Sequence, residues 1–102
     1  MRLSLQFSHL AKASFFEDMQ PSQVEKFLDS CVLRTVPDGT VIFQQDTDAP
    51  GIALIAHGCI EVSLRNLDGH VAVLHHAREA ETLGCMEAIA EQPCVASCTA
   101  VG

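Results

Sequence analysis

The sequence contains no tryptophan, no tyrosine and few basic residues. Its 102 residues include six Lys and Arg against 13 Asp and Glu, so the formal net charge is −7. A surface with this excess of negative charge repels phosphate backbones and anionic lipid headgroups. We therefore expect that this chain binds neither nucleic acid nor a membrane by itself.

Long apolar runs are also missing. No stretch approaches the roughly 20 apolar residues that span a bilayer, and the first residues lack the apolar core and cleavage site of a signal peptide. With 48% apolar and 19% charged residues, the composition is typical of one packed domain. We expect a cytoplasmic protein with a single domain, residues 1–102.

Cysteine pairs with the spacing of a metal or redox motif are absent. The five cysteines are odd in number, and their positions are 31, 59, 85, 94 and 98. Without a C-x-x-C pair, this spacing indicates free thiols in a reducing compartment. No catalytic triad, paired-carboxylate site or phosphate-binding loop stands out either, so we expect that the chain is not an enzyme.

The first third of the chain is predicted to be helical. Apolar residues follow a helical period twice, as Leu10, Ala11, Ser14 and Phe15 and as Val24, Phe27, Leu28 and Cys31. Pro21 suits the first turn of the second helix, where its missing N–H is not needed, and Ser22 with Glu25 offers a capping box. We expect Cys31 to be shielded with the rest of its apolar stripe.

From residue 32 the apolar period changes to that of short β-strands. Strand-like segments separated by glycine-containing turns cover residues 32–36, 40–43, 52–55, 60–64, 71–74 and 95–101. A short helix is predicted at 86–90, after Gly84. The predicted fold class is mainly β with short flanking helices, as an antiparallel β-roll of jelly-roll type. The last segment, 95–101, has no obvious partner strand.

This arrangement resembles the cyclic-nucleotide-binding domain of the catabolite activator and FNR-type regulators. The residues that carry the resemblance are, in chain order, Phe16-Glu17-Asp18-Met19, Val36-Pro37-Asp38-Gly39, Ile52-Ala53-Leu54-Ile55, His57-Gly58-Cys59-Ile60, Asp68-Gly69 and Leu83-Gly84-Cys85-Met86. The resemblance implies a sensory or regulatory module for a small-molecule ligand, as the N-terminal part of a transcriptional regulator or other effector. It also implies that the chain stops before the last strand and before a C-terminal helix through which a homodimer would form.

The same resemblance makes the segment 83–100 a phosphate-binding cassette. It assigns the ligand site to Gly84, Cys85, Met86, Cys94, Val95 and Ala96. Cys85 and Cys94 replace the family's ribose-binding glutamate and phosphate-binding arginine. Because each lost charge-assisted hydrogen bond costs about 1.5–3 kcal/mol, the resemblance implies that cyclic-nucleotide binding is weakened or lost. Gln45 and Ala80 stand where the family usually has glycine.

Three alternatives remain open. The chain could be a functional cyclic AMP- or cyclic GMP-binding domain. It could be a redox or haem sensor that uses Cys85, whose thiolate a helix N-terminus would favour, with Cys94 as a partner thiol. It could also be a cupin-like metalloenzyme, although adjacent His75 and His76 would point to opposite faces of a strand. We expect the histidines to be exposed, no resident haem or metal, and Cys85 to be the most reactive thiol.

Overall fold

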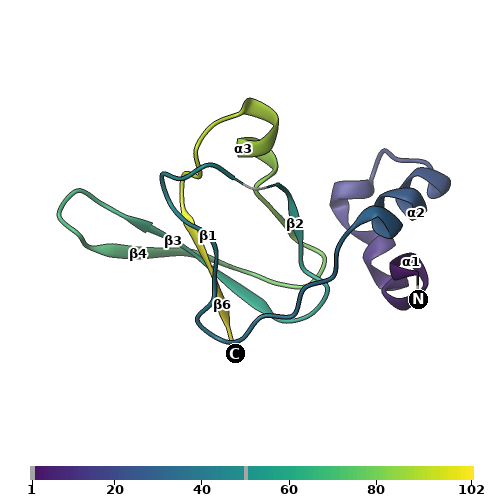
Figure 1. Cartoon of the computed structure of the whole chain (residues 1–102), viewed down its shortest axis with the longest axis horizontal. Coiled ribbons are helices and arrows are strands. Elements are labelled where there is room, and N and C mark those ends of the chain that lie inside the picture. The colour runs from purple at the N-terminus through teal and green to yellow at the C-terminus, as the bar shows by residue number, and fades with distance from the viewer. Residues whose placement is uncertain (1, 50) are drawn as a thin grey trace.

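The structure is a computed structural model that describes residues 2–49 and 51–102, apart from the side chains of Cys85, Met86 and Ile89. Its elements are, in chain order, α1 (Leu3–Gln6), η1 (Ser8–Lys12), η2 (Ser14–Phe16), α2 (Pro21–Ser30), β1 (Val41–Phe43), β2 (Ala53–Leu54), β3 (Cys59–Arg65), β4 (Val71–Ala77), β5 (Thr82–Leu83), α3 (Cys85–Ala90) and β6 (Ser97–Val101). The N-terminal helices lie together at one end, and the β3–β4 hairpin extends at the other (Figure 1). Among the described residues, every helix is too short or too polar to cross a bilayer.

The N-terminal part is helical, as predicted, but in shorter pieces. Helix α2 begins at Pro21, and its first turn is capped by Gln23, whose Oε1 accepts the backbone N–H of Gln20 at 3.0 Å. The predicted shielding of Cys31 is wrong, because α2 ends at Ser30 and Cys31 lies beyond it, exposed. The buried residues of this part form one apolar cluster, made of Phe7, Leu10, Ala13, Phe16, Val24 and Leu28.

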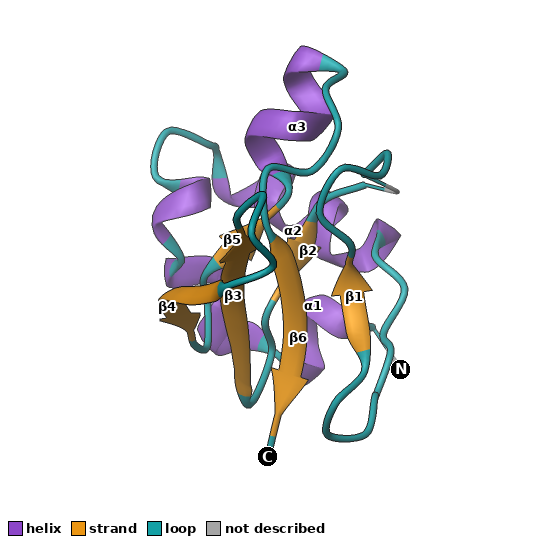
Figure 2. Ribbon diagram, turned by 90° about the vertical axis from the view of Figure 1, so that its left-hand side faces the viewer, coloured by secondary structure: helices purple, strands orange, loops and turns teal. Residues whose placement is uncertain are grey.

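The strands form a four-stranded antiparallel sheet with the order β1-β6-β3-β4, beside a two-stranded sheet of β2 and β5. Figure 2 shows β6 between β1 and β3. The expectation that the last segment lacks a partner strand is therefore wrong. Val41 of β1 lies opposite Thr99, and Ile60 of β3 lies opposite Ala100. The predicted strand at 32–36 does not form, and Val32 is 83% exposed.

The roll has a core of its own, and the segment 83–100 contributes Cys94 and Cys98 to it. Its buried residues are Phe43, Ile55, Ile60, Ala77, Cys94 and Cys98. The alternating pattern of β3 buries Ile60 but leaves Leu64 39% exposed, because the β3–β4 hairpin runs out beyond this core. The predicted fold class, a mainly antiparallel β structure with short helices, is confirmed.

Candidate ligand-binding site

Gly84 caps helix α3 from a left-handed conformation. Its φ is +83° and its ψ is 3°, and its carbonyl accepts the N–H of Ala88 at 2.9 Å. A β-carbon at this position would lie 2.7 Å from the carbonyl oxygen of Gly51 and 3.0 Å from Cζ of Phe43. Only glycine tolerates both the backbone conformation and the close approach. Gly84, at the start of α3, therefore packs directly on Gly51 in the loop that precedes β2.

Cys94 is held in place by the loop that follows β1. Its backbone N–H donates to the carbonyl of Thr47, and its carbonyl accepts the N–H of Asp46, both at 2.8 Å. The residue is only 3% exposed and belongs to the roll core with Phe43 and Cys98. The two hydrogen bonds hold the backbone of Cys94, and apolar neighbours enclose its side chain. The thiol therefore has little freedom to turn towards solvent.

The electrostatic surroundings of Cys94 favour a neutral thiol. Burial raises the pKa of Cys94, and the negative charges of Glu87 and Asp48 raise it further. Burial likewise raises the pKa of Cys98 to about 11, with smaller contributions from Cys94 and Glu87. These neighbours supply negative charge or none, which is the opposite of what an anionic ligand group requires.

The other residues that the resemblance assigns to the cassette differ in their exposure to solvent. Ala96 is 7% exposed and lies in the protein interior, whereas Val95 is 64% exposed. The side chains of Cys85 and Met86 lie outside the described part of the structure, although both residues belong to the first turn of α3. The structure thus brings Gly84, Cys94 and Ala96 to the α3 end of the roll and leaves the pairing of Cys85 with Cys94 a prediction.

Gln45 and Ala80, at the two positions where the family usually has glycine, are accommodated in different ways. The side-chain amide of Gln45 donates to the carbonyl of Arg65 at 3.0 Å and accepts the Arg65 N–H at 2.8 Å, so it ties the loop to the end of β3. Ala80 has a φ of +69°, and its N–H donates to the carbonyl of Ile55 at 2.8 Å. Ala80 therefore keeps the backbone conformation that glycine adopts more easily.

All five histidines are exposed, as predicted. His75 and His76 are neighbours in β4 and so project from opposite faces of the strand, which does not give the pair of inward rings that a cupin needs. Nε2 of His75 instead lies 2.8 Å from Oε1 of Glu81. Sequence reasoning missed a second group, His9, His57 and Glu79, because nothing in the local pattern links positions so far apart.

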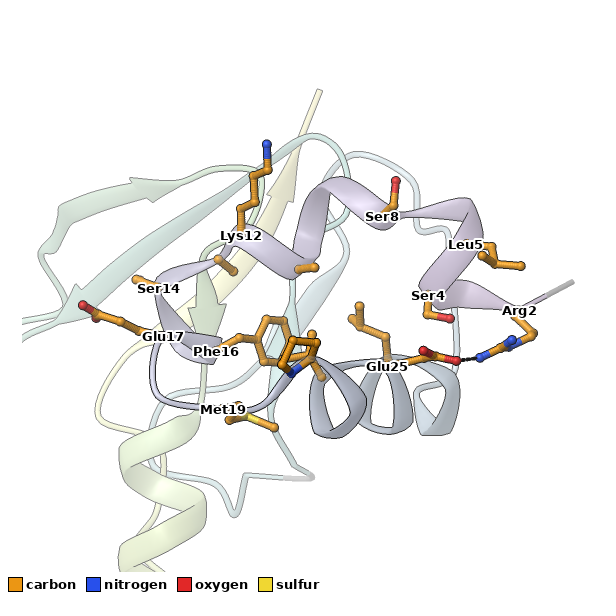
Figure 3. Close-up of a pocket in the computed structure, with 15 residues that line it drawn as sticks. Arg2, Ser4, Leu5, Ser8, Lys12, Ser14, Phe16, Glu17, Met19 and Glu25 are labelled. Carbon is orange, nitrogen blue, oxygen red and sulfur yellow. Dashed lines mark hydrogen bonds and ion pairs between the residues drawn. The ribbon is translucent and has the colours of Figure 1, made fainter.

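One hollow of the described chain lies in the N-terminal part, away from α3. Its volume is about 930 Å³, and it lies between the first helices and α2. Figure 3 shows the ion pair of Arg2 with Glu25 near α1 and the ring of Phe16 over α2. Its inner wall is apolar, with Val24 and Leu28 from α2. This hollow is separate from the residues that the sequence assigned to a ligand.

An antiparallel β-roll with the short helix α3 inserted before β6 is the architecture of a class of small regulatory domains. The family model of the cyclic nucleotide-binding domain matches residues 33–102. The chain belongs to this family, and the predicted resemblance is confirmed. A comparison with curated proteins finds no match.

Several solved structures share this fold. The regulatory domain of Toxoplasma gondii PKA with cAMP has a TM-score of 0.89 at 19% identity, over 99% of this chain and 39% of that one. The sensor domain of the transcriptional regulator DNR from Pseudomonas aeruginosa has a TM-score of 0.81 at 23% identity, over 97% and 67%. The regulatory subunit of a cAMP-independent protein kinase A from Trypanosoma cruzi, bound to guanosine, has a TM-score of 0.85 at 19% identity, over 97% and 36%.

At these identities the likeness shows the fold alone. The chain spans about two fifths of the kinase regulatory chains that it matches. The family model and the structural likeness agree on the fold, so the predicted fold type is confirmed.

Proposed function

We propose that this chain is a regulatory ligand-binding module whose site does not take a cyclic phosphate with ordinary affinity. It accepts instead a small ligand without a phosphate group, of the nucleoside class. The observation that carries the proposal is the state of Cys94, a buried and neutral thiol at the position where the resemblance places an arginine.

The charge balance around Cys94 argues against an anionic ligand. A phosphate loses its hydration when it enters a pocket, and it regains that energy only from a cation or from several hydrogen-bond donors. Here the charges that act on the Cys94 thiol are those of Glu87 and Asp48, both negative. A phosphate placed beside Cys94 would meet an apolar wall and two carboxylates.

A neutral nucleoside avoids this electrostatic penalty. Its base and sugar bind through apolar contact and neutral hydrogen bonds, which need no cation. The Trypanosoma cruzi relative supports this ligand class, because it has the same fold, is described as cAMP-independent and is bound to guanosine. The loss of the arginine at Cys94 is then a change of ligand rather than the loss of a site.

We also infer that the module is cytoplasmic and non-catalytic and acts through a separate effector. The similarity to a transcription-regulator sensor domain and to kinase regulatory chains supports a regulatory output. With a net charge of −7, the module itself is a poor surface for nucleic acid. Contact with DNA, or dimerisation through a C-terminal helix, would depend on another part of the protein.

The test is to titrate the chain separately with guanosine, adenosine, cyclic GMP and cyclic AMP and to measure each affinity by calorimetry. At least one nucleoside should bind at least tenfold more tightly than its cyclic monophosphate. The double variant Cys85→Glu with Cys94→Arg should reverse this order. Cys59→Ser, a thiol change in β3 outside the cassette, should leave it unchanged.

Low-micromolar binding of cyclic AMP by the unaltered chain would overturn the proposal. Failure of every nucleoside to bind would also overturn it. Cys94→Arg places a cation in an apolar core, so the melting transition of each variant is measured first. If the double variant is unfolded, the comparison of the four ligands on the unaltered chain still decides the question.

A further inference from the structure

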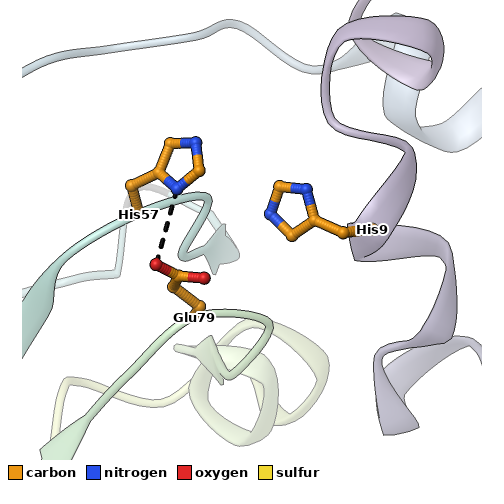
Figure 4. Close-up of side chains that lie close together, drawn as sticks. All are labelled: His9, His57 and Glu79. Atoms are coloured by element: carbon orange, nitrogen blue, oxygen red, sulfur yellow. Dashed lines mark hydrogen bonds and ion pairs between the residues drawn. The ribbon is translucent and has the colours of Figure 1, made fainter.

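Three side chains from distant parts of the chain meet between the N-terminal helices and the roll. His9 lies in η1, His57 in the turn between β2 and β3, and Glu79 in the turn between β4 and β5. Each offers one nitrogen or oxygen, and these atoms all lie within 4.8 Å of one another. Figure 4 shows the ring of His9 directed towards His57 and Glu79. We propose that the three residues bind a divalent transition-metal ion of the zinc class.

The two imidazole rings are already held side by side. The rings of His9 and His57 stack with centroids 5.3 Å apart and an angle of 25° between their planes. The buried ring of Phe7 packs edge-on against both, at 6.1 and 5.5 Å. This apolar contact keeps the two rings next to each other, which lowers the entropy cost of bringing them to one ion.

The carboxylate completes the set of donor atoms. Glu79 Oε1 lies 3.5 Å from Nδ1 of His57, so a negative oxygen faces the two imidazoles. Two neutral imidazoles and one carboxylate, with a water as fourth ligand, form a donor set that zinc commonly takes. Stacked imidazoles repel each other when both are protonated, whereas a single metal ion between them satisfies both nitrogens.

The adjustment required for coordination is small. Zinc–nitrogen bonds of about 2.0–2.1 Å place tetrahedral donor atoms about 3.3 Å apart, so the three groups must approach by about 1.5 Å at most. All three side chains are exposed and can make this movement. His9 Nε2 lies 3.2 Å from the carbonyl of Ala56, and coordination at that nitrogen would exchange one hydrogen bond for a metal bond.

A metal ion at this position would join the helical core to the roll. The two parts have separate apolar clusters, and the three ligands come from both. Metal binding should therefore slow the opening of residues 3–16 as well as raise overall stability. None of the ligands belongs to the segment 83–100, so this inference is independent of the proposed nucleoside site.

The first experiment titrates the chelator-treated chain with Zn²⁺ by calorimetry and with Co²⁺ by absorption. One ion should bind per chain, and the Tm should rise by about 10 °C when free Zn²⁺ exceeds the Kd a hundredfold. The cobalt complex should lack the near-ultraviolet charge-transfer band of a thiolate ligand, which separates this site from the cysteines. Absence of saturable binding, or a strong thiolate band, would overturn the proposal.

Variants and controls localise the ion. His9→Gln, His57→Gln and Glu79→Gln should each weaken Zn²⁺ binding at least tenfold, while His70→Gln and His76→Gln, exposed histidines outside the cluster, should not. Hydrogen exchange should slow in residues 3–16 on adding Zn²⁺ to the unaltered chain but not to His9→Gln. Equal weakening in the control variants, or unchanged exchange in residues 3–16, would contradict the proposed site.

Discussion

The carbonyl oxygen of Gly51 lies 2.7 Å from the position that a β-carbon on Gly84 would occupy. This close approach places Gly84, the residue before helix α3, against the loop that precedes β2. Gly84→Ala should therefore lower the free energy of unfolding by about 2–3 kcal/mol, because it adds a steric clash with backbone to an unfavourable φ of +83°. Urea denaturation measures the loss.

Gly69 provides a matched control for this prediction. Its φ of +85° is almost the same as that of Gly84, but nothing lies within 4 Å of its β-carbon position. Gly69→Ala should lower the free energy of unfolding only by the cost of the left-handed backbone conformation, about 1 kcal/mol. Equal losses at Gly69 and Gly84 would show that the close approach to Gly51 has no energetic weight.

Ala80→Gly should stabilise the chain. Ala80 has a φ of +69°, and the hydrogen bond of its N–H to Ile55 keeps it in that conformation. Glycine relieves the left-handed strain, and the expected gain in the free energy of unfolding is about 0.5–1 kcal/mol after the loss of one half-buried methyl group. Ala90→Gly, in helix α3, should have the opposite sign. A destabilised Ala80→Gly would contradict the prediction.

The stability of the chain should depend on Glu81 at acidic pH. Hydrogen bonds from His75 and from the backbone N–H of Arg78 hold the pKa of Glu81 below its ordinary value of 4.5. Because the folded state lowers this pKa, the contribution to stability is present above pH 4.5 and is lost as the pH falls through the folded-state value. The effect is small, since 42% of the Glu81 side chain is exposed.

Glu81→Gln tests this dependence in denaturation experiments between pH 7 and pH 3. The variant should be less stable than the unaltered chain at pH 7, and the difference should vanish at the acidic end. Glu17→Gln, which removes an exposed carboxylate after η2, controls for the change in net charge. Parallel profiles for the unaltered chain and Glu81→Gln would rule out the proposed contribution.

The thiols should react in an order set by their burial. Cys98 has a pKa of about 11, so only about one thiol in a thousand is ionised at pH 8. Cys94 and Cys98, both buried, should be alkylated later than exposed Cys31 and half-buried Cys59. Timed alkylation with mass mapping measures the order, and it also tests the prediction that Cys85 reacts first. Early modification of Cys98 would contradict its burial.

Much of the fold could be predicted because its helices and strands follow from the pattern of apolar and turn residues at neighbouring positions. The apolar stripe of Val24 and Leu28 defines helix α2, and the alternation around Ile60 defines strand β3. The order of these blocks, with a helix after Gly84, led to the family. Periodicity and turn residues are properties of neighbouring positions, so a single sequence displays them directly.

Other features depend on contacts between residues far apart, and local patterns do not contain them. The segment 95–101 looks unpaired in sequence, yet Thr99 and Ala100 pair with β1 and β3 on either side. Val32 has a high strand propensity but finds no partner strand and stays exposed. Propensity describes what a residue tolerates, whereas pairing requires a second strand that only the complete fold supplies.

The sequence by itself determined the fold class and the family, whereas the replacement of two cassette residues by Cys85 and Cys94 stays a prediction from the resemblance. Only the tertiary structure decided that Cys94 is buried beside negative charge and that His9, His57 and Glu79 meet. Burial and proximity arise when segments many residues apart pack together. The chemistry of a site follows from that packing, because desolvation and neighbouring charges, not residue type alone, set what a side chain can bind.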